Sequence, residues 1–207
     1  MTEYNKWLEY QGMPNDLLEE LKNMEQYKID EVFACNLEFG TAGIRGLLGA
    51  GTNRLNIFTV QRATLGLAKY LINNYEGQDI KVAIGYDSRH KSVEFSECAA
   101  QVLATFGIKT LIYDDVKPTP MLSYLVRKKE CQAGIMITAS HNPKEYNGYK
   151  VYNKDVQIYN QFDFRGTQQV SISGDYSYSF KNINVFGEVS KIYNQQITSA
   201  NSGWAMV

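Results

Sequence analysis

One serine, Ser140, lies at the centre of the residues in this 207-residue sequence that are best suited to chemistry. The surrounding segment, residues 134–152, reads GIMITASHNPKEYNGYKVY, so a short apolar run ends in small and polar residues. Near the serine are side chains that carry a base, a cation or an amide: His141, Asn142, Lys144, Asn147 and Lys150. A serine hydroxyl can carry a covalent group when neighbours ease its attack and stabilise the charge on that group. The alternative is a polar turn whose serine only hydrogen-bonds the backbone.

The apolar run before the serine predicts the element that positions it. Gly134–Ile137 is too short and too rich in β-branched residues for a helix, and it is typical of a buried strand. The polar residues that follow do not continue this pattern. Ser140 is therefore expected in a loop at a strand end, which is where open α/β sheets bind their ligands.

A glycine-rich stretch, Phe39–Gly51, places Arg45 among five glycines. Glycines let backbone N–H groups approach an anion closely, and a guanidinium offers a fork that matches phosphate oxygens. The spacing matches neither G-x-G-x-x-G nor a P-loop, so nucleotide binding is not supported. The alternative is a flexible surface loop with a solvated Arg45.

A second charged segment, GYDSR at residues 85–89, follows an apolar run and is another expected strand-end loop. Asp87 and Arg89 could form an ion pair that braces the site, or Arg89 could reach a ligand. We favour the brace, because structural ion pairs outnumber substrate clamps, and we keep Arg89 among the candidate phosphate-binding residues.

From residue 59 to the serine loop, helical and strand patterns alternate. Helices are expected at Thr59–Tyr75, from an N-cap at Ser92 to a stop at Gly107, and from an N-cap at Thr119 to Lys129, with strands at Ile80–Tyr86, Ile108–Tyr113 and Gly134–Ile137. This order predicts an α/β fold, a layered domain with helices packed on a mixed, largely parallel sheet.

Residues 155–207 differ in character from residues 1–154. Charged residues are few there, Asn, Gln, Ser and Tyr are frequent, and no long helical stripe is present. Alternation in Ser171–Phe180 predicts an irregular strand or a hairpin. We therefore expect a domain at 1–154 that contains the serine loop, followed by a tail at 155–207 of undetermined fold.

Composition excludes several classes of partner. Lys plus Arg (21) nearly balances Asp plus Glu (22), so no basic field is present to hold nucleic acid or an anionic membrane. The three cysteines are widely spaced and form no zinc pattern, which favours a reducing, cytoplasmic setting. No stretch approaches the roughly 20 apolar residues of a membrane span.

Three motifs together resemble one family. The sequence TASHNP at residues 138–143 with NGYK at 147–150, preceded by FGTAGIRG at 39–46 and GYDSR at 85–89, is similar to the α-D-phosphohexomutase superfamily of phosphoglucomutases and phosphomannomutases. The motifs occur in the family's order, and the wording most resembles the branch with the bacterial phosphoglucomutases and related phosphopentomutases. The resemblance covers residues 1–154 and corresponds to the family's N-terminal, catalytic-serine domain.

The resemblance implies a role for each site residue. Ser140 would carry the phosphoryl group, Arg45 would contact it, and Lys150 would act as general acid or base. His141 would be a neighbouring contact or an alternative proton carrier. The candidate substrate- and phosphate-binding residues are Arg45, Arg89, Asn142 and Lys144.

The activity implied is that of a phosphosugar mutase, which interconverts hexose 1-phosphate and 6-phosphate through a phosphoserine and a bisphosphate intermediate. It would use Mg²⁺, bound in part through the phosphate on Ser140, and a glucose 1,6-bisphosphate-type activator. The remaining metal ligands are expected in C-terminal domains of a parent enzyme, because residues 163–166, DFRG, lack the closely spaced aspartates of a metal loop. We therefore expect a domain or truncated fragment that lacks turnover alone. The alternatives are a noncatalytic α/β fragment, a sugar-phosphate-binding domain, or phosphomannomutase or phosphopentomutase specificity in the parent.

Overall fold

The computed structural model describes the backbone of residues 2–40, 43–155, 169–180, 183–194 and 204–206, and the side chains of the first two ranges. Its helices are α1 (Glu3–Glu9), α2 (Asn15–Lys22), α3 (Gln26–Val32), α4 (Ile57–Asn74), α5 (Ser92–Thr105) and α6 (Thr119–Lys128). Its strands are β1 (Ile44–Leu47), β2 (Lys81–Tyr86), β3 (Lys109–Ile112), β4 (Ala133–Ile137), β5 (Tyr146–Asn153), β6 (Gln169–Phe180), β7 (Ile183–Asn194) and β8 (Trp204–Met206). Within these ranges, no helix has the length and apolarity needed to cross a membrane.

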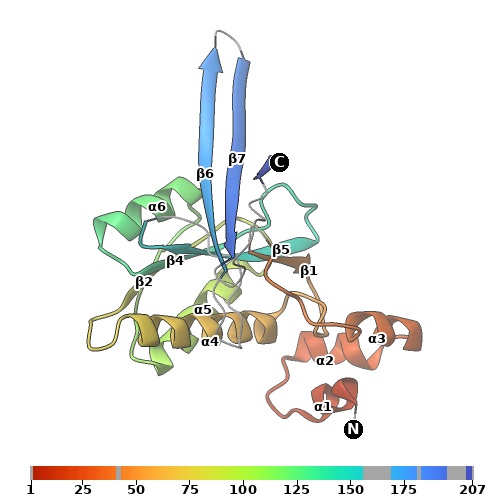
Figure 1. Cartoon of the computed structure of the whole chain (residues 1–207). Coiled ribbons are helices and arrows are strands. Elements are labelled where there is room, and N and C mark those ends of the chain that lie inside the picture. Colours follow the sequence, from red (N-terminus) through yellow and green to blue (C-terminus); the bar gives the residue numbers. More distant parts are fainter. Residues whose placement is uncertain (1, 41–42, 156–168, 181–182, 195–203, 207) are drawn as a thin grey trace.

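Five strands form one mixed sheet in the order β1-β5-β4-β2-β3 (Figure 1). β2 pairs in parallel with β3 and β4, whereas β5 runs antiparallel to β4 and β1. The α/β fold with a mixed sheet, expected from the sequence, is confirmed. The alternative of a flexible surface loop for the glycine-rich stretch is wrong at β1, because these residues pair with β5 and so give their backbone groups partners.

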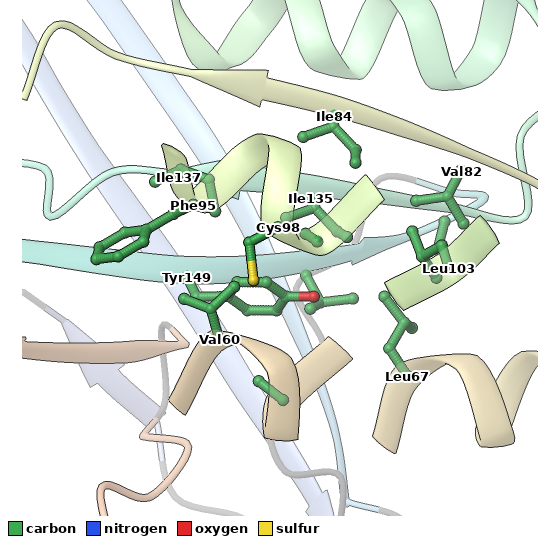
Figure 2. Close-up of a cluster of buried hydrophobic side chains, with 14 of the residues drawn as sticks. Val60, Leu67, Val82, Ile84, Phe95, Cys98, Leu103, Ile135, Ile137 and Tyr149 are labelled. Carbon is green, nitrogen blue, oxygen red and sulfur yellow. The ribbon is translucent and has the colours of Figure 1, made fainter. Parts of the chain in front are cut away.

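Helices cover both faces of this sheet, with α4 and α5 on one side and α6 on the other (Figure 1). The larger apolar cluster, on the α4 and α5 side, includes Val82, Ile84, Ile135, Ile137 and Tyr149 (Figure 2). The smaller cluster combines Ala83 and Met136 of the strands with Leu122 and Val126 of α6. Because β2 and β4 are buried on both faces, they appear in the sequence as continuous apolar runs.

Three helices begin at other residues than expected. α4 begins at Ile57, after Asn56, whose side chain accepts from the amides of Phe58 and Thr59 in a capping box. Ser92 is the first residue of α5 and Lys91 occupies the cap position, while the Ser92 hydroxyl donates to Asp87 at 3.0 Å. Similarly, Thr119 is the first residue of α6, and Pro118 occupies the cap position.

The N-terminal helices pack in a separate apolar cluster that includes Met13, Leu17, Leu21 and Ala50. Two polar contacts tie α2 to the rest of the domain. Glu20 accepts the amide of Ala50 at 2.9 Å, and Lys91 Nζ lies 2.7 Å from Asp16 Oδ2. The hydrogen bond from Lys91 lowers the pKa of Asp16 below its ordinary value.

Beyond residue 155, the described backbone forms a second sheet, in the order β6-β7-β8. β6 and β7 form an antiparallel hairpin in which Gln169 pairs with Asn194 and Phe180 with Ile183. β6 includes residues 171–180, where the sequence predicts an irregular strand or hairpin. Residues 163–166 lie outside the described residues.

Candidate active site

Ser140 lies in the loop between β4 and β5, at the end of a strand, as the sequence predicts. Its backbone has φ +56°, in the left-handed region that non-glycine residues rarely adopt. Its amide donates to Thr138 Oγ1 at 3.0 Å. A residue held in this conformation is strained, and such residues concentrate at functional sites. The side chain itself is exposed.

An open pocket of about 810 Å³ adjoins Ser140. The serine loop contributes Ser140, Asn142, Lys144 and Glu145, and the loop from β2 to α5 contributes Asp87, Ser88, Arg89 and His90. The structure thus brings Asn142, Lys144 and Arg89 to the same pocket as Ser140. Sequence reasoning missed His90 and Glu145, although both lie within a few residues of the motifs that it used.

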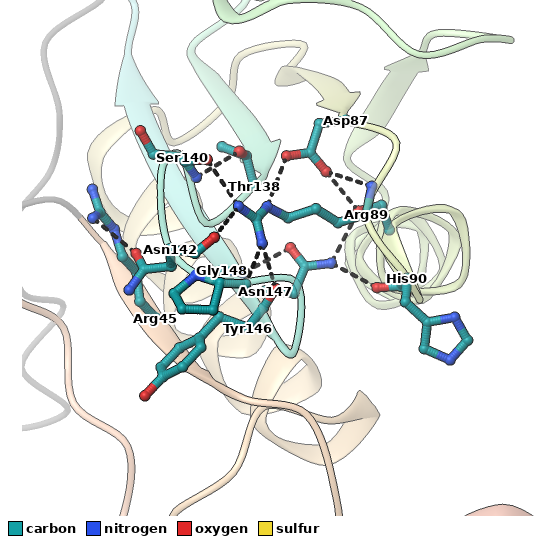
Figure 3. Close-up of polar contacts among 12 residues, drawn as sticks. Arg45, Asp87, Arg89, His90, Thr138, Ser140, Asn142, Tyr146, Asn147 and Gly148 are labelled. Carbon is teal, nitrogen blue, oxygen red and sulfur yellow. Dashed lines mark hydrogen bonds and ion pairs between the residues drawn. The ribbon is translucent and has the colours of Figure 1, made fainter.

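Arg89 is bound to the serine loop through both terminal nitrogen atoms of its guanidinium group (Figure 3). Nη1 donates to the carbonyls of Pro143 and Tyr146, each at 2.9 Å. Nη2 donates to the carbonyls of Ser140 at 2.9 Å and Asn142 at 2.6 Å. The Nε atom faces Asp87 Oδ2 at 3.5 Å. The Asp87–Arg89 ion pair that the sequence favours is therefore present, and a phosphate contact by Arg89 stays a prediction.

The segment that carries Arg89 is itself held in place by polar contacts. Asp87 Oδ1 accepts from the amide of Arg89 and the hydroxyl of Ser92, both at 3.0 Å. Asn147, fully buried on β5, donates to His90 O and Ser92 Oγ, both at 2.9 Å. The amide donors of Asn147 thus hold the β2–α5 loop, whereas the sequence offered them as donors near the serine.

Arg45 approaches the serine loop from β1. Its backbone pairs with Gly148 of β5, and its Nη1 donates to Asn142 Oδ1 at 3.2 Å. A Cβ atom added at Gly148 would lie 2.4 Å from the carbonyl oxygen of Thr138, so the close approach of the loop to β5 requires glycine there. The Nε atom of Arg45 is buried and has no hydrogen-bond partner among the described residues. This orphaned donor gives Arg45 unused capacity for an anion.

Lys150 is buried in β5, with 6% of its surface exposed. Its neighbour Tyr149 belongs to the α4 and α5 core, so the alternation of a strand places Lys150 on the opposite face. A Cβ atom at Gly43 would lie 3.1 Å from Lys150 Cγ, so the lysine stem passes the glycine-rich stretch. Lys150 and the exposed His141 are not among the residues that line the Ser140 pocket, and their proton-transfer roles stay predictions.

The metal-ligating side chains among the described residues do not form a Mg²⁺ site by themselves. Among the residues with described side chains, no three His, Cys, Asp or Glu residues lie together where they could hold a metal ion. A phosphate on Ser140 would supply only one position of the octahedral shell that Mg²⁺ prefers.

The fold and the serine loop define an α/β domain with an exposed serine at a strand end. Comparison with known proteins identifies its family. The family model described as "Phosphoglucomutase/phosphomannomutase, alpha/beta/alpha domain I" matches residues 36–175. The chain therefore belongs to the phosphoglucomutase/phosphomannomutase family and contains its domain I. The resemblance drawn from the three motifs is confirmed.

Individual relatives agree with this assignment. A phosphoglucomutase from Staphylococcus haemolyticus (strain JCSC1435) is 51% identical over 126 residues, which are 61% of this chain and 23% of that protein. One from Staphylococcus aureus (strain USA300) is 52% identical over 125 residues, which are 60% of this chain and 22% of that protein. A solved structure from Thermus thermophilus, described as a phosphomannomutase, matches with a TM-score of 0.55 and 29% identity, over 60% of this chain and 27% of that one. This chain thus spans about a quarter or less of the length of these relatives.

Proposed function

We propose that this chain supplies the phosphoserine domain of a phosphosugar mutase of the phosphoglucomutase type. The observation that carries the proposal is the position of Ser140, exposed in a strained loop at a strand end. The same loop is contacted by Arg45, which retains a buried donor without a partner among the described side chains. A carrier hydroxyl beside an incompletely used cation is suited to hold a phosphoryl group.

The reaction would proceed by phosphoryl transfer in both directions. A hydroxyl oxygen of the sugar monophosphate attacks phosphorus, and the bond between phosphorus and Ser140 Oγ breaks. A base takes the hydroxyl proton and an acid returns a proton to Oγ. The bisphosphate then reorients in the site so that its other phosphoryl group faces Ser140. Ser140 Oγ takes that group by the reverse of these steps. Positioning and charge stabilisation dominate such a transfer.

Each site residue has one role in this proposal. Ser140 carries the phosphoryl group, Arg45 clamps its oxygens, and Lys150 is the general acid or base, with His141 as the alternative proton carrier. Asn142 and Lys144 contact the substrate phosphate from the serine loop. Burial disfavours the charged form of a lysine and so suits it to act as a base, and Lys150 is buried.

Cofactor, partners and setting complete the proposal. Mg²⁺ would neutralise phosphate charge, with most of its ligands coming from outside the described residues, and a glucose 1,6-bisphosphate-type activator would prime Ser140. The remaining domains of a mutase would cover the open pocket, and the setting would be the cytoplasm. Hexose phosphate is the proposed substrate class, and mannose or pentose phosphate specificity is the alternative.

A chimera tests the function directly. Residues 36–155 of this chain would replace the matching segment of the Staphylococcus aureus phosphoglucomutase, to which the chain is 52% identical over its match. We expect the purified chimera to carry a phosphoryl group by intact mass and to convert glucose 1-phosphate to glucose 6-phosphate. Both properties should disappear in Ser140→Ala and persist in Ser123→Ala, a matched change on α6.

The 207-residue chain is the second arm of this experiment. Because its described residues make no metal site, we expect no detectable turnover when it is assayed with Mg²⁺ and the bisphosphate. A folded chimera without activity, or a phosphoryl adduct that survives Ser140→Ala, would contradict the proposed function. Binding of glucose 1-phosphate to an inactive chimera would favour the sugar-phosphate-binding alternative.

A further inference from the structure

The serine loop gathers four of its own carbonyl oxygens around one point. These belong to Ser140, Asn142, Pro143 and Tyr146, and all four accept from the guanidinium of Arg89 within 2.6–2.9 Å (Figure 3). Carbonyl dipoles that converge in this way repel one another and create a site for a cation. In this protein the cation is a side chain of the neighbouring loop.

No donor of Arg89 remains for a ligand. A guanidinium has five N–H groups in a rigid planar fork. Four of them serve the carbonyls, and the fifth, on Nε, faces Asp87 Oδ2 at 3.5 Å. Only 15% of the Arg89 side chain is exposed. A phosphate could reach Arg89 only by displacing contacts that hold the serine loop together.

The segment that carries Arg89 is itself bonded to the sheet, so Arg89 links the serine loop to the sheet. Asp87 follows β2 and is bonded to the amide of Arg89 and to Ser92 at the start of α5. Asn147 of β5 bonds the same segment at His90 and Ser92. The position of the Ser140 carbonyl is thus fixed relative to β2 and β5 by hydrogen bonds of 2.9–3.0 Å, most of them partly buried.

We propose that Arg89 is the positioning residue of the serine loop and not a phosphate ligand. Its guanidinium is an internal cation that draws the loop carbonyls to one side. The amide of Ser140 is held by Thr138 at the same time, and the Ser140 side chain lies on the far side of its backbone from Arg89 (Figure 3). The Ser140 hydroxyl therefore faces away from the Arg89 guanidinium. The benefit of this arrangement for phosphoryl transfer rests on the proposed function. The role of Arg89 in holding the loop does not depend on it.

Amide hydrogen exchange on the 207-residue chain tests the proposal. The amides of Asn142 and Tyr146 report on the loop, because they donate to Ala139 O and Pro143 O within it, and amides of β2 and β4 report on the core. We expect Arg89→Ala to speed loop exchange by about tenfold or more, as the loss of charged hydrogen bonds implies. The core amides should change little. Arg127→Ala, an exposed position on α6, is the matched control and should leave both sets unchanged.

Two further measurements separate positioning from charge. Arg89→Lys should resemble Arg89→Ala, because an ammonium keeps the charge but not the planar fork. Guanidinium ion at a non-denaturing concentration should restore loop protection in Arg89→Ala, and an equal concentration of ammonium should not. The Arg127→Ala control measures any nonspecific effect of guanidinium.

Several outcomes would overturn the proposal. These are unchanged loop exchange in Arg89→Ala, wild-type behaviour of Arg89→Lys, failure of guanidinium to restore protection, or an equal loss of protection in β2 and β4. The last would assign Arg89 to global stability. Exchange rates do not depend on phosphoryl transfer, so an inactive chimera would refute the proposed function and leave this result standing.

Discussion

Two arginines contact the same asparagine of the serine loop from opposite directions, and they differ in what they leave unused. Arg45 on β1 donates to the Asn142 side chain and keeps a buried Nε without a partner among the described residues. Arg89 on the β2–α5 loop donates to the Asn142 carbonyl and directs all its nitrogen atoms to protein acceptors. Residue type and proximity to the serine therefore do not assign a role to an arginine. The number of donors still available does, since a satisfied guanidinium holds protein and an unsatisfied one can hold a ligand.

The largest expected effect lies on the β1 side, where Lys150 passes Gly43. In the chimera, Lys150→Ala should lower turnover by roughly 10²–10⁴-fold and change its pH profile, while substrate binding stays nearly intact. Steady-state kinetics across a pH series measures this. If the Michaelis constant rises while turnover and pH profile are unchanged, Lys150 is a binding residue and His141 becomes the better candidate for the base.

Arg45 should show an intermediate effect on turnover and, unlike Arg89, little effect on the serine loop itself. Loss of one charged hydrogen bond to the phosphoryl group in Arg45→Ala should cost about 1.5–3 kcal/mol of transition-state stabilisation. Phosphoserine content and kcat/KM of the chimera should both fall. Arg45→Lys should recover part of the loss, because a cation remains beside the phosphate. Faster amide exchange in the loop of Arg45→Ala, as large as in Arg89→Ala, would show that both arginines are structural.

The smallest effect concerns the ion pair between Lys91, which precedes α5, and Asp16 of α2. Because the hydrogen bond from Lys91 lowers the folded-state pKa of Asp16 below 3.8, the pair stabilises the fold above that pH. The contribution is lost as pH falls through the folded-state pKa. Asp16→Asn should therefore lower the free energy of unfolding at pH 7 by less than about 1 kcal/mol, since the pair is solvent-exposed. Denaturant titrations should show the two proteins converging at pH values below 3.8, and a constant difference would argue against the ion pair.

The sequence was sufficient for the elements with strong apolar patterns. β2 and β4 are buried on both faces, so they stand out as apolar runs, and they place Ser140 at a strand end. β1 and β5 could not be found this way. β1 contains Gly46 between β-paired neighbours, and β5 buries Asn147 and Lys150, whose polarity hides the strand until their partners are known. Tertiary contacts override local pattern at such positions.

The sequence favours a bracing ion pair for Arg89, but the contacts of Arg89 with the serine loop were beyond it for a different physical reason. GYDSR places a cation near a strand end, and the sequence favours a brace to Asp87 without showing what else Arg89 contacts. Those contacts depend on four carbonyls of a loop that lies more than fifty residues further along the chain. Arg45 is the converse case, because its unused Nε is visible only once β1 is paired with β5.

The left-handed backbone at Ser140 creates a trade-off between fold stability and chemistry at one residue. Glycine would adopt φ +56° without the penalty of roughly 1–2 kcal/mol that a side chain incurs there. Glycine, however, has no hydroxyl, and so the substitution that relaxes the loop also removes the proposed phosphate carrier. A screen for thermal stability alone would favour the inactive residue, and only selection for activity would retain the serine.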